Sequence, residues 1–269
     1  MEWLLLAASV VLLVVLIQTE MKQKQVVPAP PIPVTKTDDV DSEVLPVGFI
    51  GNPSTWKIFV INRDVDVERL RNFEQTWKDS DFKKFGVLSY ERFPAIVPPE
   101  NIENLKPLIS NEAFEELKRT ENRGMRLHDE SLTRGAVGCY LSHYTIWQQS
   151  IANGYKHVLI FEDDAVIHPD FCSIMMLQQV AKNWSILKAG YYCIDCNETP
   201  YNYVELKKDW CLHAYFLNTS NINKYLNYMM PMAKQIDWQL HSVGAPMYGT
   251  LPVLSYQENS KFETTVQTQ

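Results

Sequence analysis

Short apolar runs alternate along this chain with longer segments of helical periodicity, and this alternation restricts the fold more than any other sequence feature. The runs are typical of buried strands, and the longer segments repeat apolar residues at the spacing of an amphipathic helix. Strands are expected at 56–61, 86–93, 157–161, 186–194 and 212–217, and helices at 67–77, 111–122, 135–152, 171–184 and 219–230. Strand–helix alternation predicts an α/β domain with a mostly parallel central sheet covered on both faces.

The chain begins with an apolar segment that predicts a membrane anchor. Residues 3–17 are apolar apart from Ser9, and as a helix they would rise roughly 22 Å. This is short of the roughly 30 Å hydrocarbon core of a bilayer, but Gln18 and Thr19 can serve as interfacial residues. We therefore expect a transmembrane anchor over 1–20. A secretory signal peptide is the alternative, although no basic segment precedes the run and no small-residue cleavage site follows it.

A proline-rich and acidic stretch separates this segment from the rest of the chain. It contains prolines at 28–33 and an acidic run at 38–41. Because proline favours extended, unpaired backbone, we expect a stem over 21–54 rather than part of a core. The remaining residues, 55–269, are numerous enough for one sizeable α/β domain.

Two sequence signals disagree about the side of the membrane on which this domain lies. Lys22 and Lys24 follow the apolar run, and the positive-inside rule would then place the domain in the cytoplasm. Three N-glycosylation sequons, at Asn183, Asn197 and Asn218, instead indicate the lumen of the secretory pathway. We expect a single-pass membrane protein and favour the lumenal orientation.

Charge and cysteine content exclude some classes of function. The formal net charge is −7, and no cluster of basic residues compensates for it, which argues against nucleic acid as a partner. Neither a GxGxxG motif nor a Walker-type phosphate loop is present. The five cysteines leave at least one free thiol. The pair Cys193 and Cys196 cannot make a structural zinc site alone, a strand thiol is the simpler interpretation of Cys193, and a Cys196–Cys211 bridge is possible.

Three carboxylates in succession, Glu162, Asp163 and Asp164, directly follow the apolar run 157–161. Polar residues at the carboxyl end of a buried strand are where α/β folds place their chemistry. Adjacent carboxylates repel one another, and they are best tolerated beside a cation, most simply a divalent metal with oxygen ligands. A solvated acidic turn is the alternative.

The surroundings of this acidic cluster carry a resemblance to a known family. Gly138-Cys139-x-Leu141-Ser142-His143, followed by the segment Val158–Ala165 with its Glu-Asp-Asp, resembles the signature of glycosyltransferase family 25. That family includes lipooligosaccharide and procollagen galactosyltransferases. Weaker matches follow in the same order as in the family, and they are Phe59–Asn62, Arg69, Trp184–Gly190, Ala214-Tyr215 and Asp237. The resemblance covers residues 56–257.

This resemblance implies a GT-A-like, single Rossmann-type domain that transfers a hexose, galactose or glucose, from a UDP-sugar with inversion. The acceptor would be a hydroxyl of a glycan, a lipid-linked saccharide or a protein. Mn²⁺ or Mg²⁺ would neutralise the leaving diphosphate, and the implied ligands are Asp164, Glu162 and His241. The implied contacts of the nucleotide sugar are Ile61, Asn62, Arg63, Arg69, Glu162 and Asp163.

Two further residues have implied roles in catalysis. Asp237 would be the general base that takes the acceptor proton, and its alternative is a helix N-cap. His143 would position the carboxylates from beneath, with a purely structural role as its alternative. A solvated surface position is the alternative for Arg69, and a surface or core position is the alternative for His241.

The chain departs from the family pattern at three positions. Ala136 replaces a glutamate, Ser185 replaces an aspartate, and Arg63 replaces a leucine. The change at Ala136 motivates a second hypothesis, a nucleotide-sugar- or glycan-binding protein that has kept the fold and lost turnover. A metal-dependent hydrolase is a third hypothesis, but the sequence lacks the second carboxylate and histidine cluster that a two-metal site needs.

Overall fold

The structure is a computed structural model, and it describes residues 51–125, 127, 130 and 132–258. The predicted anchor over 1–20 lies outside the described residues, and so does nearly all of the predicted stem. Within the described part of the chain, no helix is both long enough and apolar enough to cross a membrane.

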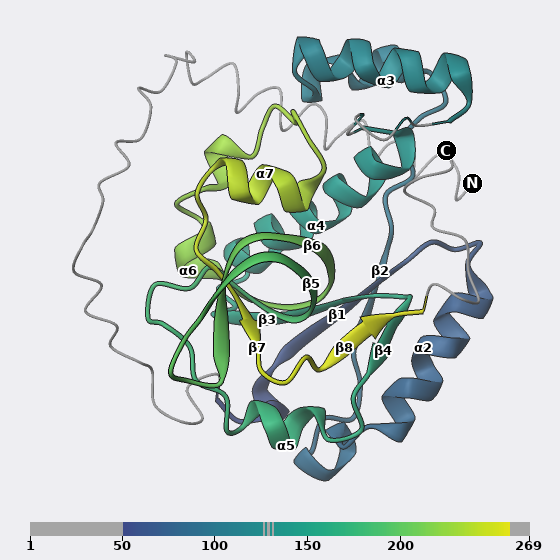
Figure 1. Ribbon diagram of the computed structural model, residues 1–269. Coiled ribbons are helices and arrows are strands. Elements are labelled where there is room, and N and C mark those ends of the chain that lie inside the picture. The colour runs from purple at the N-terminus through teal and green to yellow at the C-terminus, as the bar shows by residue number, and fades with distance from the viewer. Residues whose placement is uncertain (1–50, 126, 128–129, 131, 259–269) are drawn as a thin grey trace. The chain divides into compact units, whose positions relative to one another are not determined.

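A six-stranded mixed sheet forms the centre of the domain (Figure 1). Its strands are β1 (Lys57–Asn62), β2 (Glu91–Pro94), β3 (His157–Glu162), β5 (Ile186–Glu198), β6 (Tyr203–Asn218) and β7 (Met247–Thr250). Their order is β2-β1-β3-β6-β5-β7, and β6 runs antiparallel to its neighbours while the other five strands share one direction. The predicted α/β class and the mostly parallel sheet are therefore confirmed. The short strands β4 (Ala165–Ile167) and β8 (Ser255–Gln257) pair separately.

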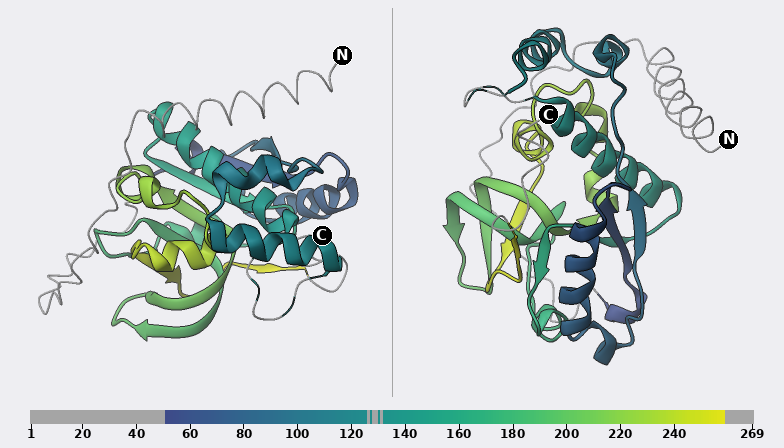
Figure 2. Two further views of the ribbon diagram at one scale, coloured as in Figure 1. Left: turned by 90° about the horizontal axis from the view of Figure 1, so that it is seen from above. Right: turned by 90° about the vertical axis from the view of Figure 1, so that its right-hand side faces the viewer.

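Helices cover both faces of this sheet (Figures 1 and 2). The α-helices are α2 (Val67–Asp79), α3 (Asn111–Arg123), α4 (Arg134–Ala152), α5 (Phe171–Met175), α6 (Thr219–Ile222) and α7 (Ile236–Ser242). Short 3-10 helices are η1 (Pro53–Thr55), η2 (Phe82–Phe85), η3 (Ile102–Leu108) and η4 (Leu226–Tyr228).

Alternation along the strands decides which helix packs on which face. Phe161 of β3 points to the face covered by α2, where its ring lies 5.5 Å from that of Phe73. Tyr215 of β6 points to the other face, where its hydroxyl accepts a hydrogen bond from Trp147 of α4. Both faces are therefore buried, as the uninterrupted apolar runs of β1 and β3 require.

The structure differs from the predicted elements in three places. The helix expected over 171–184 ends at Met175, because Gln178 and the backbone of Gln179 bind Asn202 of the neighbouring chain segment instead. The helix expected over 219–230 is divided into α6 and η4. The strand expected over 86–93 begins only at Glu91.

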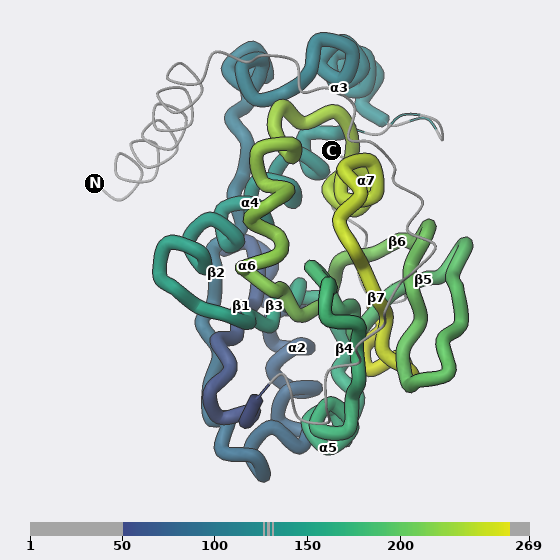
Figure 3. The backbone as a smooth tube through the Cα atoms, turned by 90° about the vertical axis from the view of Figure 1, so that its left-hand side faces the viewer, coloured from purple at the N-terminus to yellow at the C-terminus, as the bar shows by residue number. Residues whose placement is uncertain are grey.

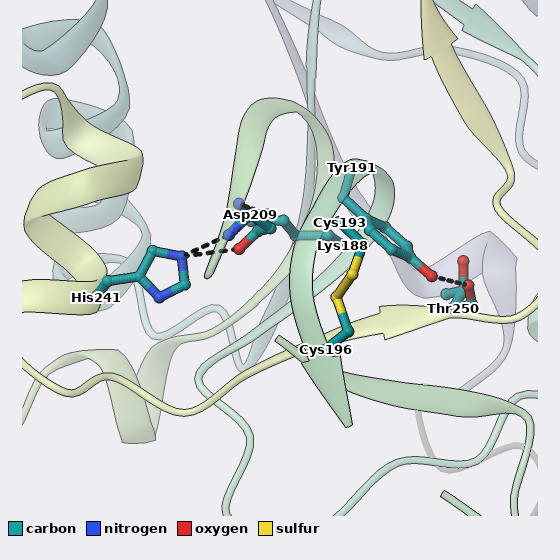
Figure 4. The surroundings of a disulfide bond; sticks show 7 residues. All are labelled: Lys188, Tyr191, Cys193, Cys196, Asp209, His241 and Thr250. Atoms are coloured by element: carbon teal, nitrogen blue, oxygen red, sulfur yellow. Dashed lines mark hydrogen bonds and ion pairs between the residues drawn. A yellow bond between two sulfur atoms is a disulfide. The ribbon is translucent and has the colours of Figure 1, made fainter. Parts of the chain in front are cut away.

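Strands β5 and β6 are longer than predicted and form a hairpin that extends beyond the central sheet (Figure 3). Its outer part is mostly exposed on β5, whereas β6 buries Tyr203, Val204 and Leu206 there among charged residues, so neither strand carries a continuous apolar run by which the sequence could predict it. A disulfide joins Cys193 to Cys196 in this hairpin (Figure 4). The interpretation of Cys193 as a strand thiol is therefore wrong. The possible Cys196–Cys211 bridge is also wrong, because Cys211 is a free thiol, as are Cys139 and Cys172.

Candidate active site

Parallel pairing of β1 with β3 brings two polar strand ends together. Ile61 lies opposite Glu162 in the register, so Asn62 reaches Asp163 and donates a hydrogen bond of 2.7 Å to it. Arg69, in the first turns of α2, donates from Nε to the other oxygen of Asp163 at 2.7 Å. The side chain of Arg69 is only 11% exposed, so the interpretation of this arginine as a solvated surface residue is wrong.

Asp164 is buried and incompletely bonded. Arg69 contacts its Oδ2 at 3.0 Å, and Gln257 of β8 donates to the same oxygen at 3.3 Å. Its Oδ1 is buried and has no hydrogen-bond partner among the described residues. Burial, followed by the negative charge of Glu162, raises the pKa of Asp164 to about 7, and Arg69 offsets only part of this effect.

Glu162 is held from beneath by a buried chain of hydrogen bonds. His143 Nε2 lies 2.9 Å from Glu162 Oε1, and His143 Nδ1 lies 2.8 Å from the hydroxyl of Tyr215. Trp147 can only donate to that hydroxyl, so Tyr215 is free to donate to Nδ1. The network thus assigns the proton to Nε2, which donates it to Glu162. Burial opposes ionisation of Glu162, but the hydrogen bond from His143 contributes to a pKa below the ordinary value.

One pocket of about 260 Å³ opens beside these side chains. All six residues that the resemblance implies as nucleotide-sugar contacts line it, and they are Ile61, Asn62, Arg63, Arg69, Glu162 and Asp163. Arg63 also forms an ion pair with Asp66. The structure thus brings the six together on one concave surface, and their binding role stays a prediction.

The two late site residues, Asp237 and His241, both lie in α7, but their side chains contact different partners. Asp237 accepts hydrogen bonds from the backbone N–H groups of Trp238 and Cys211. It lies inside the helix, because the N-cap is Gln235. Burial raises the pKa of Cys211, Lys188 lowers it, and the negative charges of Glu162, Asp237 and Asp164 raise it further.

His241 does not contact the acidic cluster. Its Nε2 lies 2.8 Å from Oδ1 of Asp209, whose other oxygen binds the fully buried Lys188 at 2.5 Å (Figure 4). The position of His241 therefore gives no support to its implied role as a metal ligand.

Sequence reasoning missed several residues that build this region. Gln257 and Cys211 connect to Asp164, while Tyr215 and Trp147 set the orientation of His143. Only Tyr215 had a sequence signal, because it belongs to the Ala-Tyr match. The others have no motif: Trp147 lies one turn after His143 on α4, whereas Gln257 and Cys211 come to the site from distant parts of the chain.

Comparison with known proteins agrees with this geometry. The sequence model of glycosyltransferase family 25 (LPS biosynthesis protein) matches residues 55–239, which is most of the chain. The chain belongs to glycosyltransferase family 25. The resemblance noted in the sequence is therefore confirmed.

Relatives within family 25 align over limited segments. The chain is 32% identical to "Glycosyltransferase 25 family member" of Drosophila melanogaster over 117 residues, which are 43% of this chain and 17% of that protein. It is 25% identical to "Procollagen galactosyltransferase 2" of Homo sapiens over 138 residues, 47% of this chain and 22% of that protein. It is 51% identical to the human "Inactive glycosyltransferase 25 family member 3" over 41 residues, 15% of this chain and 7% of that protein. The matches therefore span less than a quarter of each relative.

Proposed function

We propose that this domain transfers a hexose, galactose or glucose, from a UDP-sugar to a hydroxyl of a glycan, a lipid-linked saccharide or a protein, with inversion. The observation that carries the proposal is the buried acidic cluster at the end of β3, which opens on the pocket lined by Asn62 and Arg69. Membership of family 25 supports it. In this proposal, Arg69 and Asn62 hold Asp163 in place while the pocket receives the nucleoside diphosphate.

The acidic cluster fits a divalent cation. Three carboxylates and the guanidinium of Arg69 leave a formal charge of −2, and the buried Oδ1 of Asp164 has no partner among the described residues. Asp164 and Glu162 would hold Mn²⁺ or Mg²⁺, which prefer oxygen ligands. When bound, such a cation neutralises the charge that develops on a departing diphosphate. The nearby thiol of Cys139 suits Mn²⁺ or Mg²⁺ poorly, because these cations prefer oxygen ligands.

Asp237 would take the proton of the acceptor hydroxyl. Burial raises its pKa above the ordinary value, although the charge of Lys188 opposes the shift. A carboxylate with a raised pKa is a stronger base, and it still ionises near neutral pH when the shift is moderate. Nε2 of His143 contacts Glu162 at 2.9 Å, so in this proposal its role is to orient that carboxylate.

Release of UDP tests the proposed transfer. The chain is incubated with a panel of UDP-hexoses, Mn²⁺ and simple saccharide acceptors, and we expect UDP to appear with at least one donor. Asp164→Ala should abolish metal-dependent UDP binding, whereas the matched change Asp195→Ala on the exposed hairpin should leave it intact. Unchanged UDP binding in Asp164→Ala would contradict the metal role of this residue.

A catalytically silent binding protein is the second candidate. Ala136, in the first turn of α4, replaces the glutamate of the family pattern, and one relative carries the name of an inactive family member. Tight UDP binding with no UDP release from any donor would favour this candidate. Restoring the acidic side chain with Ala136→Glu should then increase turnover if this departure alone is responsible.

We propose further that the domain is anchored to a membrane by residues 1–20 and lies on the lumenal side. The Cys193–Cys196 disulfide supports this, because disulfides persist in oxidising compartments. Asn197, a sequon residue, lies exposed in the same hairpin. Endoglycosidase treatment of the expressed full chain should shift its mobility, and Asn197→Gln should remove the part of that shift that a glycan at this sequon contributes. A chain that is insensitive to the glycosidase would argue for the cytoplasmic orientation.

A further inference from the structure

Strand β6 contains an irregularity next to the active site. Cys211 has a φ of 78°. In the described part of the chain, all other residues with a positive φ are glycines. Tyr192 pairs with Trp210 and Gly190 pairs with Ala214, so three residues of β6 lie opposite one residue of β5. This is a β-bulge, and bulges beside active sites commonly redirect polar groups. A left-handed conformation at a residue with a side chain is unfavourable, so the surroundings must hold it.

The bulge frees the polar groups of Cys211 from the sheet and turns them toward the site. The backbone N–H of Cys211 donates to the carboxylate of Asp237. Its carbonyl accepts a hydrogen bond of 2.8 Å from Nζ of Lys188. Its thiol lies 3.1 Å from Oε1 of Gln257, and the amide of Gln257 donates to Asp164. One residue thus connects the proposed base with a proposed cation ligand.

A buried ion pair holds the bulge in place. The side chains of Lys188 and Asp209 are both 0% exposed, and Asp209 also binds His241 of α7. Burying two charges is costly, and a buried pair is often no more stable than apolar side chains would be. The Lys188–Asp209 pair, however, fixes the Cys211 carbonyl and the helix that carries Asp237 at the same time (Figure 4). Its position therefore indicates a role in geometry.

We propose that Cys211 is a positioning residue, whose left-handed backbone, held by the Lys188–Asp209 pair, fixes the position of the Asp237 carboxylate. The inference rests on the proposed function only in so far as it treats Asp237 as the general base. It assigns the effect to the backbone conformation of Cys211 and not to its thiol.

Two substitutions of Cys211 separate backbone from side chain. Glycine adopts a positive φ at no steric cost, so Cys211→Gly should keep the bulge although it removes the thiol. Valine is β-branched and strongly disfavours that conformation, so Cys211→Val should displace the N–H group that faces Asp237. Both variants are compared with the full wild-type chain in detergent, and a thermal melt verifies that each is folded.

Transfer kinetics give the first readout. With saturating UDP-sugar, Cys211→Val should lower kcat at least tenfold and leave the Kd for UDP with Mn²⁺ within about twofold, whereas Cys211→Gly should keep kcat within about threefold. Adding Asp237→Asn to Cys211→Val should lower kcat no further than Asp237→Asn alone, because both changes remove the same contribution. The proposal would be overturned if the kcat losses of Cys211→Val and Asp237→Asn multiplied in the double variant. It would also be overturned if Cys211→Gly lost as much kcat as Cys211→Val.

Hydrogen exchange gives a second readout that needs no turnover. Backbone amides of α7 should exchange at least threefold faster in Cys211→Val than in wild type, and at wild-type rates in Cys211→Gly. Equal exchange in all three proteins would overturn the proposal. If wild type transfers no sugar from any donor, the proposed function fails, and the exchange rates still decide whether Cys211 positions Asp237.

Discussion

Replacing Asp164 by asparagine should stabilise the metal-free protein at neutral pH, although it removes a proposed cation ligand. Burial raises the pKa of Asp164 from its ordinary value of 3.8 to about 7, and Asn resembles the neutral acid. At about 1.4 kcal/mol per pKa unit, the ionised carboxylate costs the folded state up to about 4 kcal/mol above pH 7. Below pH 3.8 the acid is neutral in both states, and this cost disappears. The wild type should therefore lose stability as the pH rises from about 4 to about 7.

Urea unfolding followed by tryptophan fluorescence measures this cost. In EDTA, the gap between Asp164→Asn and wild type should widen by about 3 kcal/mol between pH 5 and pH 8, since the folded protein holds the proton that the unfolded chain releases. Adding Mn²⁺ to 100 times its Kd should stabilise the wild type by about 2.7 kcal/mol and leave the variant unchanged. A gap that is the same at both pH values would refute the assignment of a raised pKa to Asp164.

Two further substitutions test the packing around the site. Tyr215→Phe should lower the free energy of unfolding by about 1–3 kcal/mol, because the indole N–H of Trp147 and the Nδ1 of His143 lose their partner; urea unfolding measures this loss. Gly190→Ala should destabilise the fold by about 1–3 kcal/mol, since the added Cβ would lie 2.1 Å from Nε2 of His213; a thermal melt measures the effect.

Each of these substitutions has a control or a contradicting outcome. Tyr228 is 42% exposed, so Tyr228→Phe should change the free energy of unfolding by less than about 0.5 kcal/mol. A loss in Tyr215→Phe no larger than in this control would show that the buried hydroxyl does not hold the site. An unchanged melting temperature in Gly190→Ala would mean that His213 can move aside.

Local sequence was sufficient to predict the parts of the molecule whose signal is short in range. The apolar run 157–161 predicted β3, and the acidic residues after it predicted the edge at which the site lies. Asn62 and Arg69 could also be placed, because Asn62 ends the first strand and Arg69 lies in the helix that follows it. These predictions needed only a strand end and the parallel neighbour that α/β alternation supplies.

Residues delivered by distant pairing could not be predicted in this way. In the sequence, Lys188 is a charged residue within an otherwise apolar strand, and no neighbouring residue identifies Asp209 as its partner. The helix expected from Phe171 onward ends early because Asn202 competes for the backbone beyond it. Positive φ at Cys211 has no sequence signal at all, since cysteine is not a residue that favours it.

Several contacts of the acidic cluster join residues that are far apart in the sequence, and this has a consequence for the rate of folding. Asn62 and Asp163 are 101 positions apart, Arg69 and Asp163 are 94 apart, and Asp164 and Gln257 are 93 apart. Each contact closes a long loop before it contributes any free energy, and such topologies fold slowly. During synthesis Asp164 can contact Arg69, which precedes it, but its bond to Gln257 must wait until residue 257 has emerged. A fragment that ends before β8 therefore lacks one of the groups that hold Asp164, whatever part of the sheet it retains.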